Sequence, residues 1–131
     1  MSNRSLKRIL YVEDEPDIQA IAKIALETVG GLNVKMCSSG QEALENVSQY
    51  SPDVILLDVM MPGMDGPSTL QALREIPELK SVPVIFMTAK VQTHEINQYL
   101  ALGAVDVIAK PFDPMSLADK VRSIWDKLEG N

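Results

Sequence analysis

The sequence predicts an α/β domain built on a parallel sheet, with helices on both faces of that sheet. Short apolar runs alternate with segments of helical periodicity along the chain, five times in all. The runs are continuously apolar rather than alternating, which is typical of strands covered on both faces. Such an order requires crossover connections, and right-handed crossovers give a doubly wound, five-stranded parallel sheet.

The first repeat illustrates the pattern. The run ILYV at 9–12 is expected to be a short buried strand. Pro16 suits the first turn of the helix that follows, and Gly30 with Gly31 suits the exit from it. By the same reasoning, the expected strands are residues 9–12, 32–37, 54–57, 82–88 and 104–109.

The later helices carry similar boundary signals. Asp65 can cap a helix that Pro77 ends, and Gly103 closes the next helix. Asp113 and Pro114 are expected to open the last helix. The expected helices are residues 16–29, 41–49, 66–76, 91–102 and 113–128.

Composition limits the class of protein. The chain has 131 residues, enough for one domain, and the expected core spans about residues 7–128. The net charge of −6 argues against direct binding to nucleic acid or to an anionic membrane. Cys37 is the sole cysteine, which excludes an intrachain disulfide and a cysteine-based zinc site. No signal-peptide core or membrane-length run is evident, so a cytoplasmic location is expected.

Polar residues follow four of the expected strands. Glu13 and Asp14 follow the first, Asp58 the third, Thr88 ends the fourth and Lys110 follows the fifth. Because the carboxyl ends of parallel strands meet at one edge, where α/β proteins bind ligands, these side chains are expected to converge.

Their chemistry predicts a phosphoryl site. Clustered carboxylates repel one another, and a divalent cation with oxygen ligands, Mg²⁺ with Mn²⁺ as the alternative, removes that penalty. With a cation and Lys110 nearby, Asp58 stays ionised and can attack phosphorus, while the Thr88 hydroxyl donates to a phosphate oxygen. Each residue also has a plainer interpretation: Asp58 as a loop acid, Glu13 and Asp14 as helix caps, Thr88 and Lys110 as ordinary strand-end residues.

Four segments together resemble the response regulator receiver domain, the phosphoacceptor of two-component signalling. They are ILYVEDEPD, VILLDVMMPGMDG, VPVIFMTA and GAVDVIAKPF, in that order over essentially the whole chain. The resemblance implies a flavodoxin-like (βα)5 fold with strand order 2-1-3-4-5. It also implies phosphorylation by a histidine kinase or a histidine phosphotransfer protein, with output through an unknown downstream protein target.

The resemblance also assigns residue roles. Asp58 resembles the phosphorylated aspartate, and Thr88 and Lys110 the phosphate-contacting pair. Asp14 resembles the direct metal ligand, Glu13 a second acid or a ligand through water. The metal set it implies comprises Glu13, Asp14, Asp58 and the backbone carbonyl of Met60.

Further implications concern the surroundings of the site. The side chains of Met60 and Lys90 are expected to tune the phosphoryl lifetime, and the Lys110–Pro111 bond is expected to be cis. Two positions depart from the family. Glu13 replaces the commoner aspartate, and Val107 stands at the switch position that usually carries an aromatic residue.

Competing functions remain on this architecture. A binding module that lacks the chemistry should have lost an acid or the lysine, and none is missing here. A flavin carrier needs a hydroxyl-rich phosphate loop where this chain has EDEPD, and an aspartyl phosphatase usually has a second acid where Met60 stands. The expected organisation is therefore a single receiver domain over 1–131 without an output domain, acting as a signalling phosphoacceptor rather than an enzyme.

Overall fold

The computed structural model describes residues 5–130 and confirms the predicted sheet. Five parallel strands lie in the order β2-β1-β3-β4-β5. Their bounds are β1 Arg8–Val12, β2 Asn33–Cys37, β3 Val54–Asp58, β4 Val84–Thr88 and β5 Asp106–Ala109. The central strands β3 and β4 are buried along their whole length, as their continuous apolar runs require.

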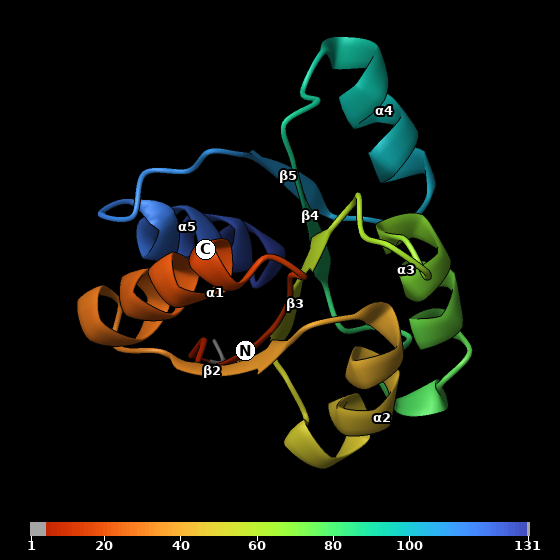
Figure 1. Ribbon diagram of the computed structural model, residues 1–131, viewed down its shortest axis with the longest axis horizontal. Coiled ribbons are helices and arrows are strands. Elements are labelled where there is room, and N and C mark those ends of the chain that lie inside the picture. The colour runs from red at the N-terminus through yellow and green to blue at the C-terminus, as the bar shows by residue number, and fades with distance from the viewer. Residues whose placement is uncertain (1–4, 131) are drawn as a thin grey trace.

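Helices cover both faces of the sheet (Figure 1). Their bounds are α1 Pro16–Lys23, η1 Ile24–Val29, α2 Gly40–Tyr50, α3 Gly66–Arg74, η2 Pro77–Leu79, α4 Thr93–Ala101 and α5 Leu117–Leu128. One core cluster lies between the sheet and α1, η1 and α5, and a second lies between the sheet and α2 and α3. α4 contains no buried residue.

Two helices differ from the sequence prediction. The first helix changes to a π-helix, η1, over its second half. This wider turn leads into Gly30, which packs so close to α5 that an added Cβ atom would lie 2.5 Å from the Ala118 Cβ atom. The prediction that Asp113 and Pro114 open the last helix is wrong. Asp113 instead accepts backbone hydrogen bonds from Met115 and Ser116, which forms a turn before α5.

The predicted cap of the third helix is confirmed. Asp65 caps α3 through a hydrogen bond that its side chain accepts from the Ser68 amide at 2.8 Å. Trp125 and Cys37 are buried in the core, and His94 is exposed. Within residues 5–130, no helix combines the length and the apolar character needed to cross a membrane.

Candidate functional site

The carboxyl edge of the sheet brings the predicted polar residues together. Glu13 follows β1, Asp58 and Thr88 are the last residues of β3 and β4, and Lys110 follows β5. Glu13 is fully buried, and Asp58 and Thr88 are each only 3% exposed. A buried carboxylate is costly unless it is paired, so each acid needs a partner at this edge.

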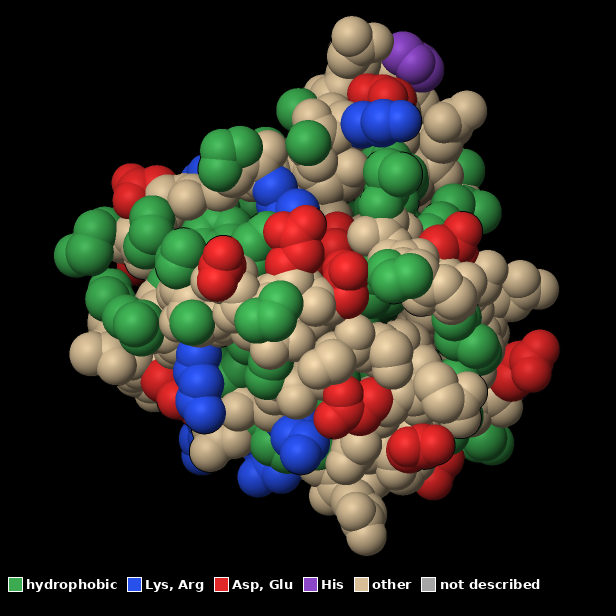
Figure 2. All heavy atoms as spheres, viewed as in Figure 1, with side chains coloured by type: hydrophobic (Ala, Val, Ile, Leu, Met, Phe, Trp, Pro, Cys, Tyr) green, Lys and Arg blue, Asp and Glu red, His purple; other side chains and the backbone are tan. Residues whose placement is uncertain are grey.

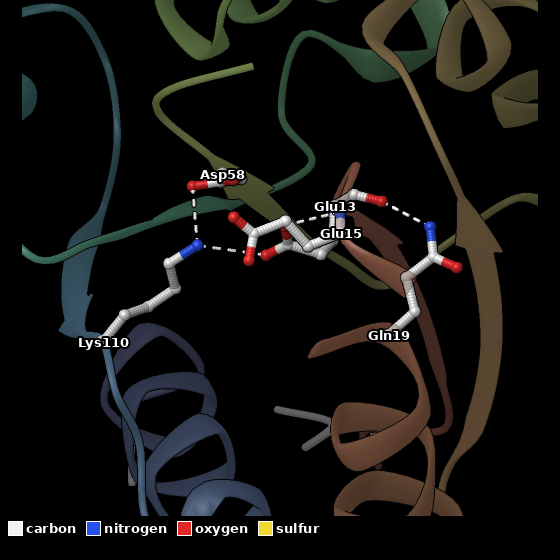
Figure 3. Close-up of polar contacts among 5 residues, drawn as sticks. All are labelled: Glu13, Glu15, Gln19, Asp58 and Lys110. Atoms are coloured by element: carbon white, nitrogen blue, oxygen red, sulfur yellow. Dashed lines mark hydrogen bonds and ion pairs between the residues drawn. The ribbon is translucent and has the colours of Figure 1, made fainter. Parts of the chain in front are cut away.

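Lys110 supplies that partner for two acids at once. Its Nζ atom lies 3.1 Å from Glu13 Oε1 and 3.1 Å from Asp58 Oδ1. Figure 3 shows the amine between the two carboxylates, with the lysine side chain reaching across from β5. The Lys110–Pro111 peptide bond is cis, which confirms the expectation from the sequence.

Contacts beyond the predicted residues fix the Glu13 end of the site. Glu13 Oε2 accepts a hydrogen bond from the Glu15 amide at 3.1 Å. Gln19 Nε2 donates to the Glu13 backbone carbonyl at 2.5 Å (Figure 3). It also donates to Ser38 Oγ at 3.2 Å. Sequence reasoning missed Gln19 and Ser38, because neither differs in pattern from a solvated polar residue near a helix start.

Burial and the shared ion pairs shift the pKa values of the site in predictable directions. Burial raises the pKa of Glu13, and the nearby Asp58 charge adds to this, while hydrogen bonds from Glu15 and Lys110 oppose it. Burial alone would lower the pKa of Lys110, but its contacts with Glu13 and Asp58 outweigh that effect and raise it. Lys110 is therefore a cation at neutral pH.

The acids also form a candidate metal site. Glu13, Asp14 and Asp58 each offer a carboxylate oxygen, and these oxygens lie within 4.8 Å of one another. In Figure 2, acidic side chains gather near the middle of the face shown, beside a basic side chain. A set of oxygen donors with part of its shell open to solvent through Asp14 fits Mg²⁺, which keeps several waters. The residues present therefore fit a divalent cation.

The remaining predicted residues lie on β4, on β5 and in the segments that follow β3 and β4. Thr88 Oγ1 accepts a hydrogen bond from the Lys90 amide at 3.1 Å. Met60 lies two residues after Asp58, beyond the end of β3, and its side chain is 66% exposed. Val107 pairs with Phe86 across β4 and β5 and packs partly buried against the core. The roles expected of Met60, Lys90 and Val107 stay predictions.

This fold and this cluster define a class of α/β protein with an acidic, lysine-bridged centre at the carboxyl edge of its sheet. The model of the response regulator receiver domain family matches residues 9–122. The chain therefore belongs to the response regulator receiver domain family, whose members act in two-component signalling as phosphoacceptors.

Individual relatives agree with this assignment. The chain is 34% identical to response regulator Rre1 of Synechocystis over 88% of its own length and 50% of the relative. It is 36% identical to the regulator PhoP of Bacillus subtilis, covering 94% of this chain and 50% of that one. The chain thus spans about half the length of these curated relatives.

Solved structures share the fold over almost their whole length. The chemotaxis protein CheY4 of Vibrio cholerae superposes with a TM-score of 0.84 at 28% identity, covering 92% of this chain and 99% of that one. The receiver domain of a histidine kinase from Syntrophus aciditrophicus gives a TM-score of 0.80 at 33% identity, covering 95% and 94%. These likenesses confirm the (βα)5 topology predicted from the sequence.

Proposed function

We propose that this chain accepts a phosphoryl group on Asp58 from a phosphohistidine of a kinase or phosphotransfer protein. The observation that carries the proposal is the Asp58 carboxylate, which is 3% exposed yet lies beside Lys110 and within a cluster of three acids. Its Oδ1 atom accepts from Lys110, whereas Oδ2 accepts no hydrogen bond from the residues described. The second oxygen is thus the available nucleophile.

The reaction is an in-line displacement at phosphorus. Asp58 Oδ2 forms the new P–O bond while the P–N bond of the phosphohistidine breaks, and the bonding electrons leave with the histidine nitrogen. A bound Mg²⁺ supplies neutralisation of the negative charge on the transferring group. The rigid, buried β3 holds Asp58 in place, so little reorganisation is needed as the bond forms.

Two side chains are the proposed ligands of the transferred group. Lys110 reaches Asp58 in the resting site and can turn its amine to a phosphoryl oxygen. The Thr88 hydroxyl, at the end of the neighbouring strand, can donate to another. Movement of Thr88 would carry the Lys90 amide with it, because that amide donates to Thr88 Oγ1. The loop from β4 to α4 is therefore the first segment expected to respond.

The partner is expected to approach beside Lys110. An apolar groove of about 150 Å³ there is lined by Ile18, Ile21, Lys110, Pro111, Phe112 and Pro114. Ile21 on α1 is 46% exposed. In Figure 2, hydrophobic side chains gather at the left, over the region where Figure 1 shows α1. A phosphohistidine donor must reach Asp58 from this edge, so an apolar surface next to Lys110 suits its docking.

Intact-mass analysis after incubation with Mg²⁺ and acetyl phosphate tests the proposal. We expect one phosphoryl adduct that is stable in acid and labile in base, and that is absent from Asp58→Asn. Asp53→Asn is the matched control, because Asp53 immediately precedes the start of the same strand and its substitution should leave labelling unchanged. Labelling of Asp58→Asn at the wild-type level would place the nucleophile elsewhere.

A further inference from the structure

Tyr11 carries a buried hydroxyl for which the site described above has no use. Its side chain is fully buried in β1, and its hydroxyl is without a hydrogen-bond partner among residues 5–130. Leaving a buried donor unpaired costs free energy that a phenylalanine in its place would not incur. The hydroxyl is therefore a feature that packing alone does not explain.

The position of Tyr11 places this donor beneath the phosphoacceptor site. Glu13 directly follows β1 and continues its ladder, because the Glu13 amide donates to the Cys37 carbonyl at 2.9 Å. Tyr11 lies two residues earlier on β1, so the two side chains leave the same face of the sheet. Tyr11 also pairs with Leu56, which precedes Asp58 by two residues on β3. Burial raises the pKa of Tyr11, and the charges of Glu13 and Asp58 raise it further, so the hydroxyl lies within the field of both carboxylates.

Glu13 is the acceptor that would need a new hydrogen-bond donor in the phosphorylated site. Its Oε1 atom is held by Lys110 at 3.1 Å, while Oε2 is held by the Glu15 amide. If Lys110 turns to a phosphoryl group on Asp58, Oε1 loses its donor while Glu13 stays fully buried. A buried carboxylate oxygen that loses its hydrogen-bond donor is stabilised by another donor nearby, also where a bound Mg²⁺ offsets part of the charge.

We propose that Tyr11 is a positioning residue whose hydroxyl donates to Glu13 once Lys110 has moved to the phosphoryl group. The inference rests on the proposed phosphorylation of Asp58. In the resting site, Glu13 is paired with Lys110 and Tyr11 is unpaired. In the occupied site, Lys110 pairs with the phosphoryl group and Tyr11 with Glu13. The tyrosine therefore favours the occupied state over the resting state. A single hydrogen bond then pairs the Tyr11 hydroxyl with the Glu13 oxygen that Lys110 has left.

Calorimetric titration with beryllofluoride, an analogue of the phosphoryl group, in saturating Mg²⁺ tests the inference with Tyr11→Phe. We expect the affinity for the analogue to fall about tenfold, the size of one hydroxyl–carboxylate hydrogen bond. The resting stability of the same variant should stay equal or rise, because an unpaired hydroxyl has been removed. A purely structural tyrosine would change stability and leave the affinity alone.

Tyr50→Phe is the matched control. The Tyr50 hydroxyl donates to the Asn33 carbonyl at 2.9 Å, away from the site. Removal of the Tyr50 hydroxyl should lower the stability and leave the affinity for the analogue unchanged. Tyr11→Phe should instead lower the affinity and leave the stability equal or higher. An affinity within twofold of wild type in Tyr11→Phe would overturn the inference, since the cation alone would then satisfy Glu13.

A measurement on the unaltered protein removes dependence on the variant. With ¹³C at tyrosine Cζ, the Tyr11 resonance should move downfield when beryllofluoride and Mg²⁺ are added, as its hydroxyl begins to donate. An unmoved resonance in protein that binds the analogue would refute the inference while sparing the proposed function. Failure of the wild type to bind the analogue would instead refute the proposed function, and this inference with it.

Discussion

Two aspartates at opposite ends of β3 have different partners. Asp53 precedes the strand, and its Oδ2 atom accepts from the backbone amides of Lys7 and Arg8 at 3.0 and 2.9 Å. Asp58 ends the strand, and its Oδ1 atom accepts from the Lys110 amine at 3.1 Å. Backbone donors are fixed by the fold, whereas a lysine amine can exchange one partner for another.

This difference separates an acid that supports the fold from one that is available for chemistry. The donors of Asp53 cannot leave without disturbing the start of β1. The donor of Asp58 is shared with Glu13 and can turn to an incoming anion. The same residue type, at the two ends of one strand, therefore gains its role from the mobility of its donors.

Removing the shared donor should have the largest effect on stability. Lys110→Ala leaves Glu13 and Asp58 as buried carboxylates without their cation, so we expect the free energy of unfolding to fall by about 3 kcal/mol. Chemical denaturation measures the loss. Adding Mg²⁺ should restore more stability to the variant than to the wild type, because the cation then has no competing ammonium. Equal stabilisation of both proteins would argue that Lys110 does not neutralise this cluster.

The two aspartates should respond to substitution with different signs. Asp53→Ala removes two hydrogen bonds to a charged acceptor, and we expect a loss of about 2 kcal/mol. Asp58→Asn removes one of three clustered acids and leaves Lys110 paired with Glu13, so stability should be unchanged or higher. Parallel urea titrations measure both. A comparable loss in the two variants would erase the distinction between the two ends of β3.

The sequence predicted the convergence of the acids but not the network between them. Asp58 and Lys110 could be placed at one edge because parallel strands align their carboxyl ends. The bridge from Lys110 to Glu13 depends on side-chain rotamers across β1 and β5, which no local pattern encodes. The unpaired Tyr11 hydroxyl was equally hidden, because ILYV is an apolar run in which tyrosine counts as one more large side chain.

Gly66 packs against the backbone of Asp58, so a substitution there tests whether the position of Asp58 at the end of β3 controls its reactivity. A Cβ atom on Gly66 would lie 2.6 Å from the Asp58 carbonyl oxygen and 2.8 Å from Val59 Cα. Gly66→Ala must therefore shift the end of β3, and we expect a loss of about 1–2 kcal/mol together with slower phosphorylation of Asp58.

The control for Gly66 lies in the loop that precedes α3. Gly63 has a φ of +76° with open space around an added Cβ atom, so Gly63→Ala strains the backbone by a similar amount without touching Asp58. Its phosphorylation by acetyl phosphate, followed by mass, should match the wild type. If both variants slow the reaction alike, loop strain rather than the position of Asp58 sets the rate.

The smallest change in stability is expected for a substitution in the groove beside Lys110. Ile21 is 46% exposed, so Ile21→Asp should change stability by less than about 0.5 kcal/mol. The same change introduces a charge into an apolar docking surface, and we expect transfer from a phosphohistidine protein to slow about tenfold. Labelling by acetyl phosphate, which needs no docking, should be unaffected.

Val29→Asp is the matched control, because Val29 is 43% exposed but lies outside the groove. Equal slowing by both variants would show that the acidic charge, not the groove, governs the encounter.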